Sequence, residues 1–190
     1  MKSVDQARYR ELSFQQLKEQ DLPLMYSWLQ KPHVREFYHR EGIASWEETR
    51  DHYRERLVID WPTKCFLSCI GRPIGYIQTY RVADYPDYAA TIGEVEGISV
   101  DLFIGDTDHL GIGWGRLILL KFVNEVAFPL FPGENVCWIY HEKLNQRALR
   151  ASQAAGFRYV RDFVEDGSQK ELLGLGKGEC ARLAVGTVTR

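Results

Sequence analysis

Long apolar runs and signs of export are missing from this sequence. No stretch of the 190 residues is apolar over the length that a membrane-spanning helix needs, and residues 1–20 are polar and charged, unlike a signal peptide. The formal net charge is −2, so the basic excess typical of a bulk nucleic-acid binder is missing too. We therefore expect a cytoplasmic protein whose partners include neither a membrane nor a nucleic acid.

Cysteine and histidine are too scattered to form a metal-ligand pattern. The cysteines lack close metal-type pairs; they are Cys65, Cys69, Cys137 and Cys180. The five histidines share no ligand spacing on any expected helix; they are His33, His39, His52, His109 and His141. The sequence predicts no metal site and, without an export signal, reduced cysteines.

Internal repeats, low-complexity tracts and linkers are also lacking, and the length suits one domain with a sizeable core. We expect a single domain over residues 1–180 and a loose tail over residues 181–190. Apolar patterning predicts strands over residues 8–14, 64–70, 73–82, 92–104, 135–140, 157–164 and 170–175. Patterning and capping signals predict helices over residues 21–30, 45–57, 117–128 and 144–155. This order is typical of an α+β fold with a mixed sheet.

The most informative segment joins an apolar strand to an apolar helix through glycines at alternate positions, Gly111, Gly113 and Gly115. Such a turn lets the backbone curl so that several N–H groups point one way at the start of the following helix. Unpaired N–H groups and the helix dipole both favour a phosphate there. The segment therefore predicts an anion cradle, with a plain strand-to-helix turn as the alternative.

A single carboxylate lies inside the strand that leads to this turn. Alternation places Asp101 with Ser99 and Phe103 on one face of the strand, whereas the other face is apolar. Asp101 is therefore a candidate general base close to the cradle. The alternative is an acid that only makes structural hydrogen bonds.

Charge is divided unevenly along the chain. Between residues 84 and 108 there is no Lys or Arg, and the acids are Asp84, Asp87, Glu94, Glu96, Asp101, Asp106 and Asp108. A cleft walled by these acids would attract a cation, although a solvated acidic loop is the alternative. Positive charge follows at Arg116, Lys121, His141, Lys143, Arg147 and Arg150. The pattern predicts a cationic acceptor on one side and an anionic cofactor on the other.

A second motif follows the glycine turn at a suitable distance: Asn145 and Ala148 open a helix that closes with Ala155-Gly156-Phe157. Together the two motifs resemble those of the GNAT superfamily of N-acetyltransferases. Within it the chain is similar to the aminoglycoside 6'-N-acetyltransferases. The segments that match this group are residues 25–29, 33–38, 73–80 and 100–106. Siderophore-type acetyltransferases share parts of the same signature.

The resemblance implies a GNAT fold, with a mixed, mostly antiparallel sheet of six or seven strands flanked by about four helices. It implies acetyl-CoA as co-substrate, no metal, and direct acetyl transfer to a primary amine of a small cationic molecule, above all the 6'-amine of an aminoglycoside. Alternative acceptors are a siderophore precursor, a polyamine or a protein amine. A non-catalytic acyl-CoA-binding sensor is the alternative function, and a monomer or homodimer is expected.

The resemblance also assigns residues to roles. Asp101 would be the catalytic base, and the backbone of Phe103 and Ile104 would face the pantetheine arm where the sheet splays open. The other residues implied to bind the cofactor are Gly111, Ile112, Gly113, Trp114, Gly115, Arg116, Asn145 and Arg147. Asp101 would also bind the acceptor. From the acidic segment, one face of the strand over residues 73–82 and a loop-like aromatic segment, we expect the acceptor to be bound also by Glu94, Glu96, Tyr76, Gln78 and Tyr38. Core packing is the alternative for Tyr76.

Two positions depart from the superfamily pattern. Leu110 stands where a Gln or Arg usually precedes the glycines, and Ser152 stands where many relatives carry the Tyr that protonates the leaving thiolate. The general acid is therefore left to Tyr140 or to solvent. Tyr140 also takes the place of a second acidic residue that relatives use for the aminoglycoside.

Overall fold

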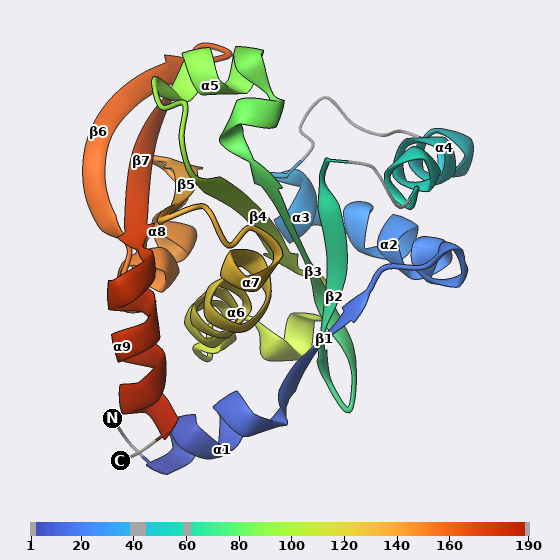
Figure 1. The fold of residues 1–190 in the computed structure, drawn as a ribbon. Helices are drawn as coiled ribbons and strands as arrows, with labels where there is room; N and C mark the ends of the chain where they lie inside the picture. Colours follow the sequence, from blue (N-terminus) through green and yellow to red (C-terminus); the bar gives the residue numbers. More distant parts are fainter. Residues whose placement is uncertain (1–2, 39–44, 59–61, 189–190) are drawn as a thin grey trace.

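The computed structural model describes residues 3–38, 45–58 and 62–188 and is built on one seven-stranded sheet (Figure 1). The strands are β1 (Leu12–Gln16), β2 (Lys64–Ile70), β3 (Arg72–Arg81), β4 (Ile98–Ile104), β5 (Val136–Glu142), β6 (Arg158–Glu165) and β7 (Ser168–Gly176). Their order across the sheet is β1-β2-β3-β4-β5-β7-β6. All neighbours are antiparallel except β4 and β5, so the expected α+β fold with a mixed, mostly antiparallel sheet is confirmed.

Helices cover both faces of this sheet (Figure 1). The helices of one face are α2 (Leu22–Leu29), α3 (Pro32–Arg35) and α4 (Trp46–Arg56). Those of the other face are α1 (Ser3–Glu11), α6 (Trp114–Phe122), α8 (Gln146–Ala154) and α9 (Lys177–Val188). The remaining helical segments are α5 (Pro86–Ile92), a π-helical turn (Val123–Ala127), α7 (Phe128–Leu130), and 3-10 turns at Glu19–Asp21, Val82–Asp84 and Thr107–His109. In the described part of the chain, no helix has the length and apolarity needed to cross a membrane.

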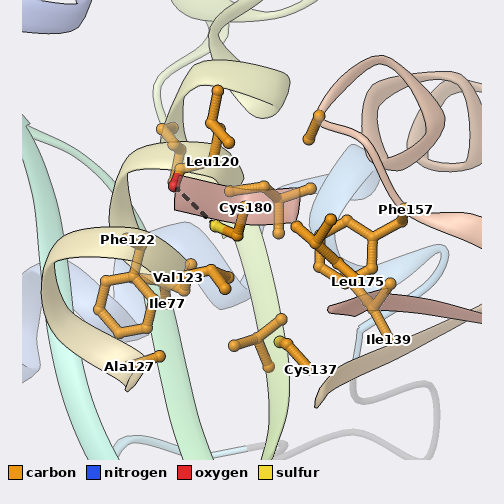
Figure 2. Packing of buried hydrophobic residues seen from close by; sticks show 14 of the residues in the cluster. Ile77, Leu120, Phe122, Val123, Ala127, Cys137, Ile139, Phe157, Leu175 and Cys180 are labelled. Carbon is orange, nitrogen blue, oxygen red and sulfur yellow. Dashed lines mark hydrogen bonds between the residues drawn. The ribbon is translucent and has the colours of Figure 1, made fainter. Parts of the chain in front are cut away.

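Alternation along the strands separates two hydrophobic cores. On one face, Ile98 of β4 packs in a cluster with Leu117 of α6 and with residues of α8 and α9. Figure 2 shows the part of this cluster around Cys180, whose thiol donates to the carbonyl of Leu120 at 3.9 Å. On the opposite face, Phe103 of β4 packs with residues of α2 and α4. All four cysteines are buried free thiols, as expected.

Strands β4 and β5 separate soon after they meet. Their ladder joins only Ile98 with Cys137 and Ser99 with Trp138, whereas β3 pairs with β4 along its whole length. From Val100 onward, the edge of β4 that faces β5 is therefore open. Because backbone N–H and C=O groups on an open edge need other partners, this gap can hold an extended ligand.

The N-terminal strand is shorter than expected. Residues 3–11 form helix α1, and β1 begins only at Leu12 instead of at residue 8. The α1 sequence is mostly polar, so it lacks the apolar stripe by which helices are recognised. Its position is fixed from outside, because the Lys121 Nζ of α6 donates to the carbonyls of Tyr9 and Leu12, both at 2.7 Å.

Two other expected segments also need correction. The strand expected over residues 92–104 begins only at Ile98, because α5 precedes it and ends at Gly93, whose φ of 66° lies in the left-handed region. The expectation of a loose tail is wrong as far as residue 188, where helix α9 ends. Cys180 and Ala184 of that helix are buried. The single domain over residues 1–180 stays a prediction.

Candidate active site

The glycine turn is built as an open backbone loop at the start of α6. Gly111 and Gly113 have φ values of 74° and 93°, which only glycine adopts without strain, and Gly113 is the N-cap of α6. A Cβ at Gly111 would meet nothing within 4 Å, and at Gly113 it would come no closer than 3.8 Å to a side chain. The first N–H groups of a helix have no partner within it. The turn therefore leaves room and donors for an anion.

Gly115 has a different role from the two glycines before it. A Cβ at this position would lie 3.3 Å from the Cβ of Ala151 in α8. Gly115 therefore permits the close approach of α6 and α8. Its glycine character reflects helix packing, whereas that of Gly111 and Gly113 reflects backbone conformation.

The segment before the turn is fixed by Asp106. Its carboxylate accepts the backbone N–H of Asp108 at 3.1 Å and pairs with Arg72 at 2.6 Å and with His109 at 3.2 Å. Although burial raises it, the pKa of Asp106 lies below its usual value because of this N–H, the charge of Arg72 and the contact with His109. Asp106 is thus engaged in holding the loop.

The register of β3 with β4 decides which backbone groups face the gap. At one end of β4 the Val82 N–H donates to the Gly97 carbonyl, and at the other end the Gly105 N–H donates to the Ile74 carbonyl, both at 2.9 Å. Because hydrogen-bonded and non-hydrogen-bonded pairs alternate in an antiparallel ladder, odd-numbered residues of β4 turn their backbone toward β3.

This alternation corrects one sequence-based assignment. The backbone of Phe103 pairs with Tyr76 of β3, so Leu102 and Ile104 are the residues whose N–H and C=O groups face the gap. The Ile104 carbonyl lies 3.0 Å from Nε2 of His33 in α3. The assignment of Ile104 to this edge agrees with the structure, and that of Phe103 does not.

Asn145 and Arg147 lie where α8 begins. The Asn145 Oδ1 accepts the N–H of Ala148 at 3.1 Å, so this side chain caps the helix. Arg147 is exposed in the first turn of α8. The cap explains the Asn-x-x-Ala spacing on structural grounds alone, and a role of either residue toward the cofactor stays a prediction.

Asp101 is the centre of a polar network on the opposite face of β4. Its Oδ2 accepts the Nε2 amide of Gln78 at 2.8 Å. The Gln78 Oε1 in turn accepts the phenol of Tyr76 at 2.7 Å and the Arg56 guanidinium of α4 at 3.4 Å. These contacts fix the orientation of the Gln78 amide, and the amide fixes the carboxylate.

The surroundings shift the pKa of Asp101 upward. Burial is the main cause, and the Glu165 carboxylate adds to it. Hydrogen bonds from Gln78 and Tyr80 and the positive charge of Arg56 oppose the shift without cancelling it. A carboxylate with a raised pKa is a better proton acceptor than an exposed one, which suits a general base.

Aromatic rings surround this carboxylate. The Tyr38 ring lies 4.8 Å from that of Phe103, which stacks at 5.5 Å on Tyr76. Burial raises the pKa of both Tyr38 and Tyr76, so both phenols stay neutral. Tyr76 is fully buried and Gln78 nearly so, which favours the core-packing alternative for Tyr76. Tyr38 remains partly exposed.

The acidic segment does not form a wall without bases. Three of its seven acids meet arginines from outside the segment: Asp84 pairs with Arg81 at 2.8 Å, Asp106 with Arg72 at 2.6 Å, and Glu94 with Arg161 of β6 at 3.1 Å. Glu96 is exposed, and its carbonyl accepts the Trp138 indole N–H. No contact described for Glu94 or Glu96 reaches Asp101. The expectation of an acidic wall without bases is therefore wrong, and acceptor binding by Glu94 and Glu96 stays a prediction.

Ser152, which occupies the missing tyrosine position, and Tyr140, the candidate general acid, are both poor proton donors. Ser152 is fully buried, and its Oγ lies 2.7 Å from Nε2 of His141 on β5. Burial lowers the pKa of His141 to about 4, so its imidazole is neutral near pH 7. For Tyr140, burial and the carboxylates of Asp101 and Glu165 raise the pKa far above its usual value. Of the two expected general acids, Tyr140 and solvent, the structure therefore favours solvent.

Three residues of this region were not recognised in the sequence. Arg56 reaches Gln78 from the last turn of α4, while Lys31 and His33 bind the carbonyls of Gly105 and Ile104 at 2.8 and 3.0 Å. Each of these contacts joins residues that are far apart in the chain. No local spacing signals them, since they depend on how the helices dock on the sheet.

Comparison with known proteins adds an independent result. The model of the Acetyltransferase (GNAT) domain matches residues 18–164. The chain belongs to the GNAT acetyltransferase family. The aminoglycoside N(6')-acetyltransferases type 1 of Klebsiella pneumoniae and Serratia marcescens are each 27% identical over 148 residues, which cover 74% of this chain and 71% of theirs.

Solved structures agree on the fold. The crystal structure of aminoglycoside acetyltransferase AAC(6')-Ib in complex with coenzyme A matches with a TM-score of 0.76 at 20% identity, covering 91% of this chain and 99% of that one. The aminoglycoside N(6')-acetyltransferase of Legionella pneumophila matches with a TM-score of 0.72 at 20% identity, covering 91% and 96%. The GNAT fold implied by the motifs is thus confirmed.

Proposed function

We propose that this GNAT protein transfers the acetyl group of acetyl-CoA to a primary amine that binds beside Asp101. One observation carries the proposal: the edge of β4 that opens after Ser99 leads directly to the glycine turn at the start of α6. An extended thiol arm fits the open edge, and its phosphates fit the turn. That AAC(6')-Ib has been crystallised with coenzyme A and with acetyl-CoA supports this cofactor.

The chain's own groups divide the work between the two faces of β4. N–H groups at the start of α6 bind the pyrophosphate, and the backbone of Leu102 and Ile104 holds the thiol arm. An N–H of this open edge stabilises the negative charge that develops on the thioester oxygen. Asp101 accepts a proton from the ammonium, directly or through water, so that the amine nitrogen can attack the thioester carbon. Water then protonates the departing thiolate.

The 6'-amine of an aminoglycoside is the acceptor we propose first. The curated relatives at 27% identity are aminoglycoside N(6')-acetyltransferases, and AAC(6')-Ib has been crystallised with kanamycin. The carboxylate of Asp101, fixed by Gln78 within a group of aromatic rings, suits an ammonium joined to a sugar ring. A cytoplasmic location and a monomeric or homodimeric state stay predictions.

A second acceptor class is favoured by a specific observation. The guanidinium of Arg56 lies beside Gln78 and influences Asp101, while the acids around the strand are paired with arginines. The positive charge of Arg56 would repel a polycation but attract an anionic group. It therefore suits an amine that also carries an anionic group, as a siderophore precursor can.

Thiol release from acetyl-CoA tests the function. We expect release with kanamycin to exceed release with spermidine, a peptide amine and lysine, and to fall on the order of 10²–10⁴-fold in the Asp101→Asn variant. Preference for lysine over kanamycin would favour the second acceptor class. Acetyl-CoA binding without release for any amine would contradict catalysis and favour a sensor.

A further inference from the structure

Helix α1 lies outside the region that defines the family, yet it contacts the glycine turn. The family model begins to match at residue 18, seven residues after α1 ends at Glu11. The Arg8 Nη1 donates to the carbonyl of Ile112 in the turn at 2.8 Å. The same guanidinium lies 4.1 Å from the centroid of Trp114, the first residue of α6.

Arg8 is thereby held at the mouth of the turn. Of the side-chain atoms around Gly113, its Nη1 is the nearest, 3.8 Å from where a Cβ would lie. A guanidinium carries five N–H donors in a planar fork, so one bond to Ile112 leaves others for an anion. The Trp114 ring and the Ile112 carbonyl fix the plane of the fork before any ligand arrives.

Arg116, the cation that the sequence assigns to the turn, is already engaged. Its guanidinium pairs with Asp5, one turn before Arg8 in α1, at 2.5 Å. Among the described residues, no carboxylate is paired with Arg8. The turn also lacks the polar side chain that usually precedes its glycines, because Leu110 stands there. The Arg116 Nε lies 3.9 Å from where a Cβ of Gly113 would be, close to the 3.8 Å of Arg8, but only the Arg116 charge is paired with a carboxylate among the described residues.

We propose that Arg8 is a cofactor-binding residue, which donates to a phosphate of the coenzyme bound at the turn. The proposal rests on the proposed function, since it requires a phosphate there. It makes α1 a part of the cofactor site as well as a support for α6. The pyrophosphate and the 3'-phosphate of coenzyme A present the same chemistry to a guanidinium, and the ligands used in the test separate them.

Calorimetric titration of the full chain with coenzyme A tests the proposal. We expect Arg8→Gln to weaken binding about tenfold, because the neutral amide keeps a donor for Ile112 but loses the charge. Arg8→Lys should keep most of the affinity. Arg10→Gln is the matched control, since Arg10 is exposed on the same helix, and it should bind as the wild type does.

The salt dependence of coenzyme A affinity distinguishes a direct contact of Arg8 with phosphate from a purely structural role of Arg8 in the turn. The dependence of log Kd on log salt should be shallower for Arg8→Gln than for the wild type. With 3'-dephospho-coenzyme A, a loss that persists assigns Arg8 to the pyrophosphate, and a loss that disappears assigns it to the 3'-phosphate. Equal affinity of Arg8→Gln and wild type overturns the proposal, as does an equal loss in Arg8→Lys and Arg8→Gln with unchanged salt dependence. A wild-type chain that binds no coenzyme A contradicts the proposed function instead.

Discussion

The glycine turn follows strand β4, whereas the acidic segment of residues 84–108 contains that strand, and the two differ in how far their sequence predicts their structure. Gly111 and Gly113 adopt the left-handed conformation that an open turn requires. The acids expected to line an acceptor cleft are instead paired with Arg72, Arg81 and Arg161. Backbone conformation is encoded by the residue that adopts it, whereas the net charge of a surface depends on every chain segment folded against it.

The same difference predicts where a single substitution should impair binding or catalysis. At the turn, Gly111 and Gly113 are each needed for their own backbone angles, so a single change should damage binding. At the acidic segment three of the acids are paired with arginines, so we expect the carboxylate inside the polar network, Asp101, to matter most.

Loss of Asp101 should cost the most. Asp101→Asn keeps the shape of the side chain but removes the charge and the base, so kcat should fall on the order of 10²–10⁴-fold, with acetyl-CoA affinity nearly unchanged. Ser152→Ala, on the other side of β4, should do much less because Ser152 is a poor proton donor. Steady-state kinetics of both variants at several pH values measures this. Full activity of Asp101→Asn would remove the base from the account, and an inactive Ser152→Ala would return a catalytic role to that position.

A side chain at Gly113 should block the turn. Gly113→Val strains a backbone with φ of 93° and fills the space above it, so acetyl-CoA affinity should fall well over tenfold, or more than ~1.4 kcal/mol. Gly167→Val is a matched control, because Gly167 has φ of 71° and open space but lies in the β6–β7 turn. Calorimetry on folded variants measures both. Unchanged affinity in Gly113→Val would contradict the cradle.

Much of this contrast could be anticipated from the sequence, and the exceptions have a common cause. The turn, the face that carries Asp101, and the strands around them follow from local patterns of glycine and apolar residues. Helix α1 was missed because contacts with α6, not its own sequence, fix it. The backbone direction of Phe103 depends on its register with β3, and the neutral state of His141 on its burial under α8. Each of these three features depends on contacts with a segment that is distant in the sequence.

Removal of Gln78 should move the pH profile. The pKa of Asp101 is raised, and the amide of Gln78 opposes the rise by bonding to the charged form. In Gln78→Leu the pKa of Asp101 should therefore rise further. As the pH is lowered, activity should then begin to fall at a higher pH than in the wild type. Gln153→Leu, exposed on α8, is the control. An acid limb of kcat/KM that stays in place or moves to lower pH would contradict this network.

Ionic strength should have the smallest of these effects, and it should change cofactor binding more than acceptor binding. Raising ionic strength from about 0.01 M to about 1 M shortens the Debye length from ~30 Å to ~3 Å. The Kd for coenzyme A should rise, since phosphates meet exposed cations. The KM for kanamycin should change only about twofold, because Asp84, Glu94 and Asp106 are already paired with arginines. A steep rise in that KM would restore the acidic wall that the structure removes.

The most direct test of the central claim is a crystal structure of the chain with coenzyme A. The account predicts the pyrophosphate on the N–H groups that follow Gly113, and the thiol arm bonded to the backbone of Leu102 and Ile104 in the gap beside β5. The sulfur would then lie near the Asp101 side of β4. Coenzyme A bound elsewhere, or an arm that leaves the open edge of β4 unpaired, would contradict it.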